Sequence, residues 1–135
     1  MGKRHNSLLI PYYFKDSELY VFLQRRTDDA PRNPGKLGGF GGGVDGEETY
    51  EQALLREMKE ELEYIPQKFS LLGTFPTDHS ISNYYAEEVN ENFEDYISVH
   101  EGKWGEWHKA TELITRNDVS TNGKKVVEFM INSFK

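Results

Sequence analysis

Three glutamates lie close together in the segment "REMKEEL", residues 56–62. At helical spacing Glu57, Glu60 and Glu61 repel one another, which costs helix stability unless another interaction offsets it. Hard divalent cations such as Mg²⁺ take oxygen ligands, usually one or two carboxylates with water and substrate phosphates. The segment is therefore either a solvated helix face, the common case for a run of charges, or a site for a divalent cation.

A glycine-rich segment precedes these glutamates. The run "LGGFGGG", residues 37–43, has five glycines in seven positions. Glycine permits positive φ, and its backbone can approach a phosphate or a metal ion without interference from a Cβ atom. Arg56 has a candidate ion-pair partner in Glu48, and this pair would hold the loop against the helix. The loop and the carboxylates together indicate a metal–diphosphate site.

The elements that position these residues follow from apolar periodicity. From Glu47 to about Tyr64 the pattern predicts a helix whose core face carries Leu54, Leu55, Met58 and Leu62. The neighbouring face of that helix presents the three glutamates together. Alternating and β-rich segments predict strands over 7–14, 19–25, 68–78, 82–90, 95–100 and 104–108.

The remaining segments complete the layout. The prolines and polar residues of 27–36 predict a loop. Residues 110–115 and 120–134 are predicted as helices, the first short and the second terminal. Strand-rich and helical segments in this order predict an α/β (α+β) fold with helices on the faces of a mixed sheet.

Composition limits the classes of function. The chain of 135 residues predicts one domain over 1–135, and its net charge of −7, from 16 basic and 23 acidic residues, argues against binding of a nucleic-acid polymer or a membrane surface. There is no cysteine, so a disulfide or thiolate metal site is impossible. No signal peptide is recognisable and no apolar run approaches ~18 residues, so we expect a cytoplasmic protein.

The stretch "GGVDGEETYEQALLREMKEELEY", residues 42–64, resembles the Nudix box. That motif has Gly, five residues, Glu, seven residues, Arg-Glu, an aliphatic residue, one residue, Glu-Glu, one residue, Gly and an aliphatic residue. Two final positions depart from it, since Glu63 replaces the glycine and Tyr64 replaces the aliphatic residue. The glycine normally ends the helix in a left-handed cap. The matching positions are Gly42, Glu48, Arg56, Glu57, Met58, Glu60 and Glu61.

The resemblance implies the Nudix fold, an α/β/α sandwich with a mixed central sheet. It also implies hydrolysis of a nucleoside diphosphate linked to another group, with Mg²⁺ or Mn²⁺ as cofactor. Glu48 and Arg56 would orient loop and helix, and Glu57 is also a candidate general base. The metal ligands implied by the resemblance are Glu57, Glu60, Glu61, the carbonyl of Gly41, and Glu101 in "HEGKWGEW", which resembles a glutamate of MutT-like members.

Substrate contacts are expected from three further residues. Arg25 and Arg26, at the end of the second strand, are candidates for phosphate binding, with surface charge as the alternative. Asn122, before the last helix, lies where MutT-like enzymes contact a purine. Four aromatic residues could stack on a base but more often fill a core, namely Phe40, Tyr84, Tyr85 and Trp104.

The function most consistent with these features is a MutT-like (d)NTP pyrophosphohydrolase, with oxidised purine nucleotides among the candidate substrates. The small-molecule substrate could instead be a nucleotide sugar, ADP-ribose or a dinucleoside polyphosphate. A different class of function is a Nudix module that binds a nucleotide without hydrolysis, but such modules commonly lose the carboxylates that this chain retains. The sequence is compatible with a monomer or a homodimer.

Overall fold

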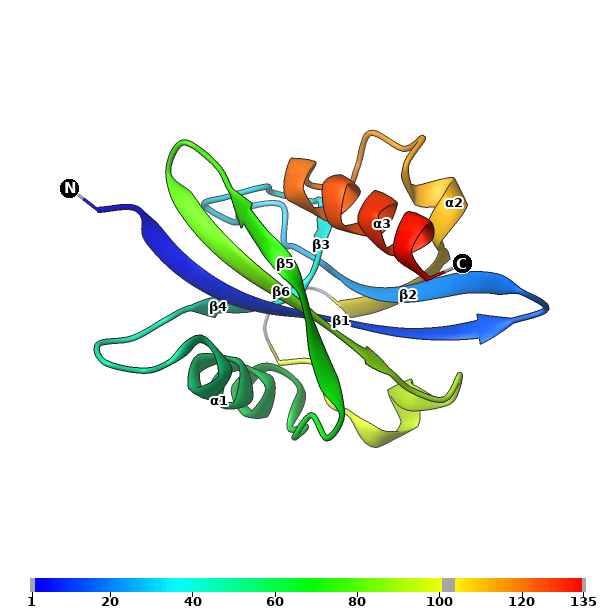
Figure 1. Cartoon of the computed structure of the whole chain (residues 1–135), viewed down its shortest axis with the longest axis horizontal. Coiled ribbons are helices and arrows are strands. Elements are labelled where there is room, and N and C mark those ends of the chain that lie inside the picture. Colours follow the sequence, from blue (N-terminus) through cyan, green and yellow to red (C-terminus); the bar gives the residue numbers. More distant parts are fainter. Residues whose placement is uncertain (1, 101–103, 135) are drawn as a thin grey trace.

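In a computed structural model that describes residues 2–100 and 104–134, seven strands form one mixed sheet (Figure 1). Strand β1 pairs antiparallel with β2 and β4 but parallel with β6, and β7 pairs antiparallel with β2. The principal order is β3-β2-β1-β6-β5. The predicted α+β architecture with a mixed sheet is confirmed. The strands are β1 (Arg4–Lys15), β2 (Glu18–Arg25), β3 (Leu37–Gly38), β4 (Phe40–Gly43), β5 (Phe69–Pro76), β6 (Ser80–Glu88) and β7 (Trp104–Lys109).

Helices cover both faces of the sheet. Helix α1 (Tyr50–Leu62) lies on one face, and α2 (Ala110–Leu113) and α3 (Thr121–Ser133) lie on the other (Figure 1). Successive strand residues point to opposite faces, so Leu9 of β1 packs on the α1 side while Ile10 packs on the α3 side. This alternation gives two cores, one on each side of the sheet. In the described residues no helix is long and apolar enough to cross a membrane.

Helix α1 begins later than the sequence pattern predicts. Thr49 is its N-cap and forms a capping box with Gln52, so Glu48 lies in the preceding turn. Its core face is fully buried at Leu54, Met58 and Leu62, and burial of each such side chain contributes about 1.5–3 kcal/mol. The prediction for Leu55 is wrong, because this side chain is 38% exposed. The list of buried positions is completed by Ala53, Glu57 and Glu61.

The end of α1 explains the first departure from the motif. Glu63 adopts the left-handed conformation, with φ 52° and ψ 43°, that the expected glycine would adopt. The N–H groups of Ser98 and His100 then donate to the carbonyls of Leu62 and Glu61, at 3.0 and 2.8 Å. This segment therefore donates hydrogen bonds to carbonyls at the helix end that have no partner within the helix, and it does not pair with a neighbouring strand. The predicted strand 95–100 is wrong, and a 3₁₀ helix, η1 (Phe93–Tyr96), includes its first two residues.

Tyr64 accounts for the second departure. Its ring packs edge-on against the buried Phe93, with ring centroids 5.0 Å apart. Its hydroxyl donates to the buried carboxylate of Glu87 at 2.5 Å. Glu87 also accepts from the backbone N–H groups of Gln67 and Lys68, at 2.6 and 2.8 Å. Burial, followed by the hydrogen bond to Glu87, raises the pKa of Tyr64. Tyr64 therefore joins the helix exit to β5 and β6 through a polar contact that an aliphatic residue cannot make.

The left-handed conformation at position 63 should cost stability. Glycine adopts this conformation without the Cβ penalty, so Glu63→Gly should stabilise the fold by about 1 kcal/mol. The unfolding temperature should rise by about 3–5 °C. Glu63→Ala is the matched control, because it removes the same carboxylate and its contact with His100 but keeps the Cβ atom. Equal unfolding temperatures for the two variants would show that the backbone conformation carries no strain.

Candidate active site

A cleft of about 1120 Å³ lies where β4, α1, the loop 27–36 and the start of α3 meet. Its deepest carboxylates are Glu57 and Glu61 of α1, which are 9% and 2% exposed. These two side chains are one helical turn apart and both line the cleft together with Gly41–Gly43 of β4. The structure thus brings together the glycine run and two of the three glutamates singled out in the sequence.

The glycines allow β4 to approach the carboxylates closely. A Cβ atom on Gly42 would lie 2.7 Å from Oε2 of Glu57, which is closer than real contacts permit. A Cβ atom on Gly41 would lie 2.0 Å from the carbonyl oxygen of Ser7, and this glycine has φ +143°. The N–H of Gly41 donates to Oε1 of Glu61 at 3.1 Å. The glycine run therefore approaches the carboxylates of α1 closely, and it forms strands β3 and β4 and not a free loop. Its predicted approach to a phosphate or a metal ion stays a prediction.

Arg56 joins the turn before α1 to the helix and to β4. Its Nε and Nη2 atoms donate to both carboxylate oxygens of Glu48, at 2.7 and 3.0 Å. Nη2 also donates to the carbonyl of Gly43 at 2.9 Å. The hydrogen bond from Arg56 holds the pKa of Glu48 below its usual value, and Glu48 in turn raises the pKa of Arg56. This pair therefore stays charged and forms the bidentate link that the sequence spacing predicts.

Glu60 lies beside this pair and outside the cleft lining. Its Oε2 atom is 3.4 Å from Nη1 of Arg56, and the same nitrogen lies 3.5 Å from Oε1 of Glu57. Within residues 2–100 and 104–134, no three His, Cys, Asp or Glu side chains form a ready group for a metal ion. Glu60 would have to leave Arg56 to join Glu57 and Glu61. Two buried carboxylates beside an accessible backbone nevertheless match the donors that a Mg²⁺ ion takes in a phosphate site.

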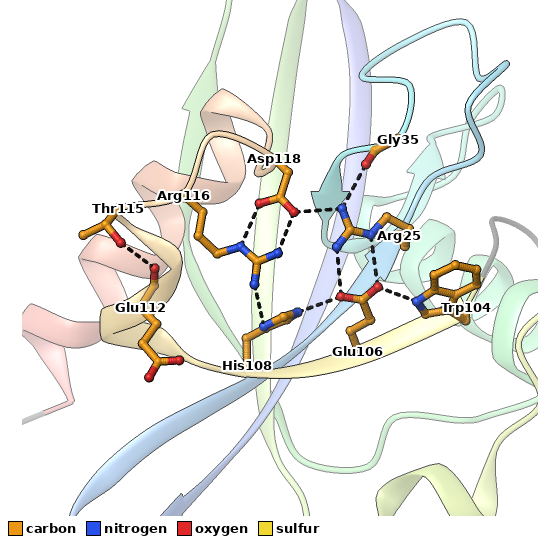
Figure 2. Close-up of polar contacts among 9 residues, drawn as sticks. All are labelled: Arg25, Gly35, Trp104, Glu106, His108, Glu112, Thr115, Arg116 and Asp118. Atoms are coloured by element: carbon orange, nitrogen blue, oxygen red, sulfur yellow. Dashed lines mark hydrogen bonds and ion pairs between the residues drawn. The ribbon is translucent and has the colours of Figure 1, made fainter.

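The predicted substrate-binding residues separate into two groups. Arg26 and Asn122 line the cleft, whereas Arg25 does not. Figure 2 shows Arg25 between Glu106 of β7 and Asp118 of the segment before α3, with both ion pairs at 3.0 Å. The prediction that Arg25 binds a substrate phosphate is therefore corrected, because its guanidinium is engaged by two protein carboxylates.

The network around Arg25 holds one wall of the cleft. Arg116 donates to Asp118 at 2.6 Å, and His108 contacts both Arg116 and Glu106 (Figure 2). Burial alone would raise the pKa of Glu106, but hydrogen bonds from Arg25, His108 and Trp104 lower it to about 2. The hydrogen bond from Arg116 likewise lowers the pKa of Asp118. Asp118 leads directly into Ser120 and the start of α3, so this network fixes the wall that carries Asn122.

Other predicted residues occupy varied positions. Glu101 lies outside the described residues, so its role stays a prediction. Phe40 and Tyr85 belong to the core on the α1 side, whereas Tyr84 is buried in the other core and also lines the cleft. Trp104 is 49% exposed and donates to Glu106.

Asn122 has an unusual polar atom. Its Oδ1 is buried and has no hydrogen-bond partner in the part of the chain that the structure describes. Its Nδ2 makes one long contact of 3.5 Å to the carbonyl of Phe75. A buried acceptor without a partner is costly, so this amide is suited to receive a donor from a ligand in the cleft.

Two arginines are among the cleft residues that sequence reasoning missed. Arg4, at the start of β1, and Arg32, in the loop 27–36, both line the cleft. Arg4 reaches it because β1 pairs with β4 and β6, which are distant in the sequence. No local spacing signals either residue; a strand pairing established beforehand could have located Arg4.

The NUDIX domain family model matches residues 3–129. The chain therefore belongs to the Nudix family of hydrolases, which act on nucleotide phosphoanhydride bonds with divalent metal ions. Over 97 residues it is 36% identical to the 8-oxo-dGTP diphosphatase of Escherichia coli (strain K12), covering 69% of this chain and 72% of that protein.

Two solved structures show the same fold. The NUDIX domain of Shewanella oneidensis NrtR complexed with ADP ribose has a TM-score of 0.77 at 16% identity, covering 100% of this chain and 90% of that one. The MutT protein from Methanosarcina mazei Go1 has a TM-score of 0.76 at 18% identity, covering 100% and 99%. At these identities the likeness concerns the fold alone.

The lowered pKa of Glu106 predicts an acid-dependent loss of stability. Its folded value of about 2 lies below the ordinary 4.5, so its contribution is present above pH about 4.5 and is lost as the pH falls toward 2. Glu106→Gln should lower the free energy of unfolding at pH 7 by about 1–3 kcal/mol, and by much less at pH 3. Urea unfolding at both pH values measures this difference.

Glu91→Gln is the matched control for Glu106→Gln. It removes an exposed carboxylate paired with Lys15, and such surface pairs contribute little. An equal loss of stability at pH 7 and pH 3 for Glu106→Gln would contradict the proposed role of its charge.

Proposed function

We propose that this protein is a Mg²⁺-dependent, MutT-like nucleoside triphosphate pyrophosphohydrolase that releases a nucleoside monophosphate and pyrophosphate. The observation that carries the proposal is the pair of buried carboxylates, Glu57 and Glu61, facing a nucleotide-sized cleft beside the glycines of β4. Identity of 36% to an 8-oxo-dGTP diphosphatase favours oxidised purine nucleotides as substrates. Mn²⁺ is the expected substitute for Mg²⁺.

Glu57, Glu61 and Glu60 are the proposed metal ligands, together with the carbonyl of Gly41 and with Glu101. A bound divalent cation would neutralise the diphosphate and lower the pKa of a coordinated water. Glu57 is also the proposed base that accepts a proton from the attacking water. Arg56 and Glu48 hold the turn and the helix in register, so that these carboxylates keep their positions relative to β4.

The proposed substrate lies with its phosphates near β4 and α1 and its base near the start of α3. Arg26 would contact a phosphate, since its Nε is anchored by the carbonyl of Arg32 at 2.7 Å while its side chain lines the cleft. Asn122 would accept a hydrogen bond from the base through Oδ1. The water oxygen would form a bond to one of the two phosphorus atoms of the α–β phosphoanhydride while the bond from that phosphorus to the bridging oxygen breaks. The water proton would pass to Glu57, and the products are the nucleoside monophosphate and pyrophosphate.

A substrate panel tests this proposal directly. Normal and oxidised nucleoside triphosphates, nucleotide sugars, ADP-ribose and dinucleoside polyphosphates should be incubated with Mg²⁺, with identification of the products. The proposal expects monophosphate and pyrophosphate from triphosphates as the fastest reaction. Faster cleavage of ADP-ribose or of a dinucleoside polyphosphate would replace it with another Nudix activity. Tight nucleotide binding without turnover would favour a binding module.

Glu60→Gln should abolish Mg²⁺-dependent hydrolysis and leave the fold intact. The Glu60 side chain is 51% exposed, so its replacement disturbs no core contact. Loss of one charge-stabilising group in an active site costs roughly 100-fold or more in rate. Steady-state kinetics and the unfolding temperature measure the two effects. Glu51→Gln, the same exchange at an exposed site on the same helix, should keep full activity. Wild-type turnover in Glu60→Gln would refute its assignment to the metal site.

A further inference from the structure

The six arginines of the chain divide into two groups. Arg25, Arg56 and Arg116 each form an ion pair with a carboxylate. In residues 2–100 and 104–134, no carboxylate pairs with the others, and all three line the cleft: Arg4, Arg26 and Arg32. Cations that have no internal counterion and share one cleft are suited to an anionic ligand.

Arg4 is the most specifically positioned of these three residues. Its Nε donates to Oδ1 of Asn6 at 3.0 Å, and Nδ2 of Asn6 donates to the buried hydroxyl of Ser82 at 3.2 Å. Its backbone N–H donates to the carbonyl of His79 at 3.1 Å. Because only Nε has a protein acceptor in the described chain, the two terminal Nη groups remain available to a ligand. A chain of hydrogen bonds thus orients a guanidinium that has no carboxylate partner among residues 2–100 and 104–134.

The guanidinium of Arg4 lies over Gly43. A Cβ atom at Gly43 would be 3.2 Å from Nη2 and 3.5 Å from Nε of Arg4. The carbonyl of the same glycine accepts from Arg56, so Gly43 lies between an arginine with several carboxylate partners and one with none in the part of the chain that the structure describes. This glycine directly follows Gly42, which packs against Glu57. Arg4 is therefore placed at the end of the cleft where the carboxylates lie.

We propose that Arg4 binds the phosphate chain of the substrate through its Nη groups. The inference rests on the proposed function, because it assigns a role within the same cleft. A guanidinium donates two parallel hydrogen bonds to a phosphate and stays charged at all relevant pH values. Arg4 lies far outside the Nudix box, and it faces Gly43 of β4 from β1, so it can contact a phosphate from the side opposite α1.

The test compares Arg4→Gln, Arg4→Lys and the neighbouring Lys3→Gln, a control that removes one positive charge outside the cleft lining. Loss of a charge-assisted hydrogen bond should raise KM for a nucleoside triphosphate about 10-fold or more in Arg4→Gln. The value of kcat should change much less, as expected for an interaction made equally in the ground and transition states. Arg4→Lys should restore part of the affinity, and Lys3→Gln should match the wild type.

Inorganic tripolyphosphate provides a readout that needs no hydrolysis. With Mg²⁺ present, its dissociation constant, measured by calorimetry, should rise by a similar factor in Arg4→Gln, whereas binding of the unphosphorylated nucleoside should not change. Unchanged tripolyphosphate binding in Arg4→Gln would overturn the inference, even if the wild type hydrolyses triphosphates. If the wild type hydrolyses no triphosphate but Arg4→Gln still weakens tripolyphosphate binding, the phosphate-binding role of Arg4 is supported and the proposed reaction is rejected.

Discussion

The close approach of β4 to helix α1 is the constraint on which the site depends. Gly42 leaves no room for a side chain against Glu57, and Gly41 donates its N–H to Glu61. A side chain at Gly42 would displace the Glu57 carboxylate, and a side chain at Gly41 would collide with the carbonyl of Ser7 in β1. Either change would move a carboxylate and the backbone relative to each other. The fold therefore uses the absence of side chains at Gly41 and Gly42 to set the positions of charges on α1.

Both carboxylates and arginines line this cleft. Glu57 and Glu61 are buried, which would be costly for isolated carboxylates. Arg56 contacts Glu57, and Arg4, Arg26 and Arg32 also line the cleft. The proposed cation would lie between the buried carboxylates and an anionic ligand. In an acidic chain with a net charge of −7, the proposed binding of a polyphosphate depends on this local placement of arginines and not on the net charge.

Local spacing predicted the helix and the ion pair between Arg56 and Glu48. These two residues lie on one short segment of the chain, and the glycines of β4 directly precede the same segment. The positions of two other arginines depend on pairing between segments that are distant in the sequence. Arg25 looked available until β7 and the segment before α3 brought Glu106 and Asp118 to it. Arg4 entered the cleft through the pairing of β1 with β4 and β6.

The helix exit shows a second limit of local reasoning. Glu63 adopts the left-handed conformation expected of a glycine, and Tyr64, in place of an aliphatic residue, donates a hydrogen bond to Glu87. The segment after η1 was predicted as a strand because its residues are β-rich. Its N–H groups instead donate hydrogen bonds to the last carbonyls of α1. This interaction depends on where the helix ends in space, which local sequence does not reveal.

Binding of Mn²⁺ to Gly42→Ala is the most direct test of the central claim, that the contact between β4 and α1 positions a metal site. Electron paramagnetic resonance of free Mn²⁺ gives the affinity, and Gly38→Ala is the control, because its Cβ atom would make only ordinary contact, 3.4 Å from Oγ of Ser120. We expect the affinity for Mn²⁺ to be at least about 10-fold weaker in Gly42→Ala, with an unfolding temperature within a few degrees of Gly38→Ala. Wild-type Mn²⁺ affinity in a folded Gly42→Ala would contradict the central claim.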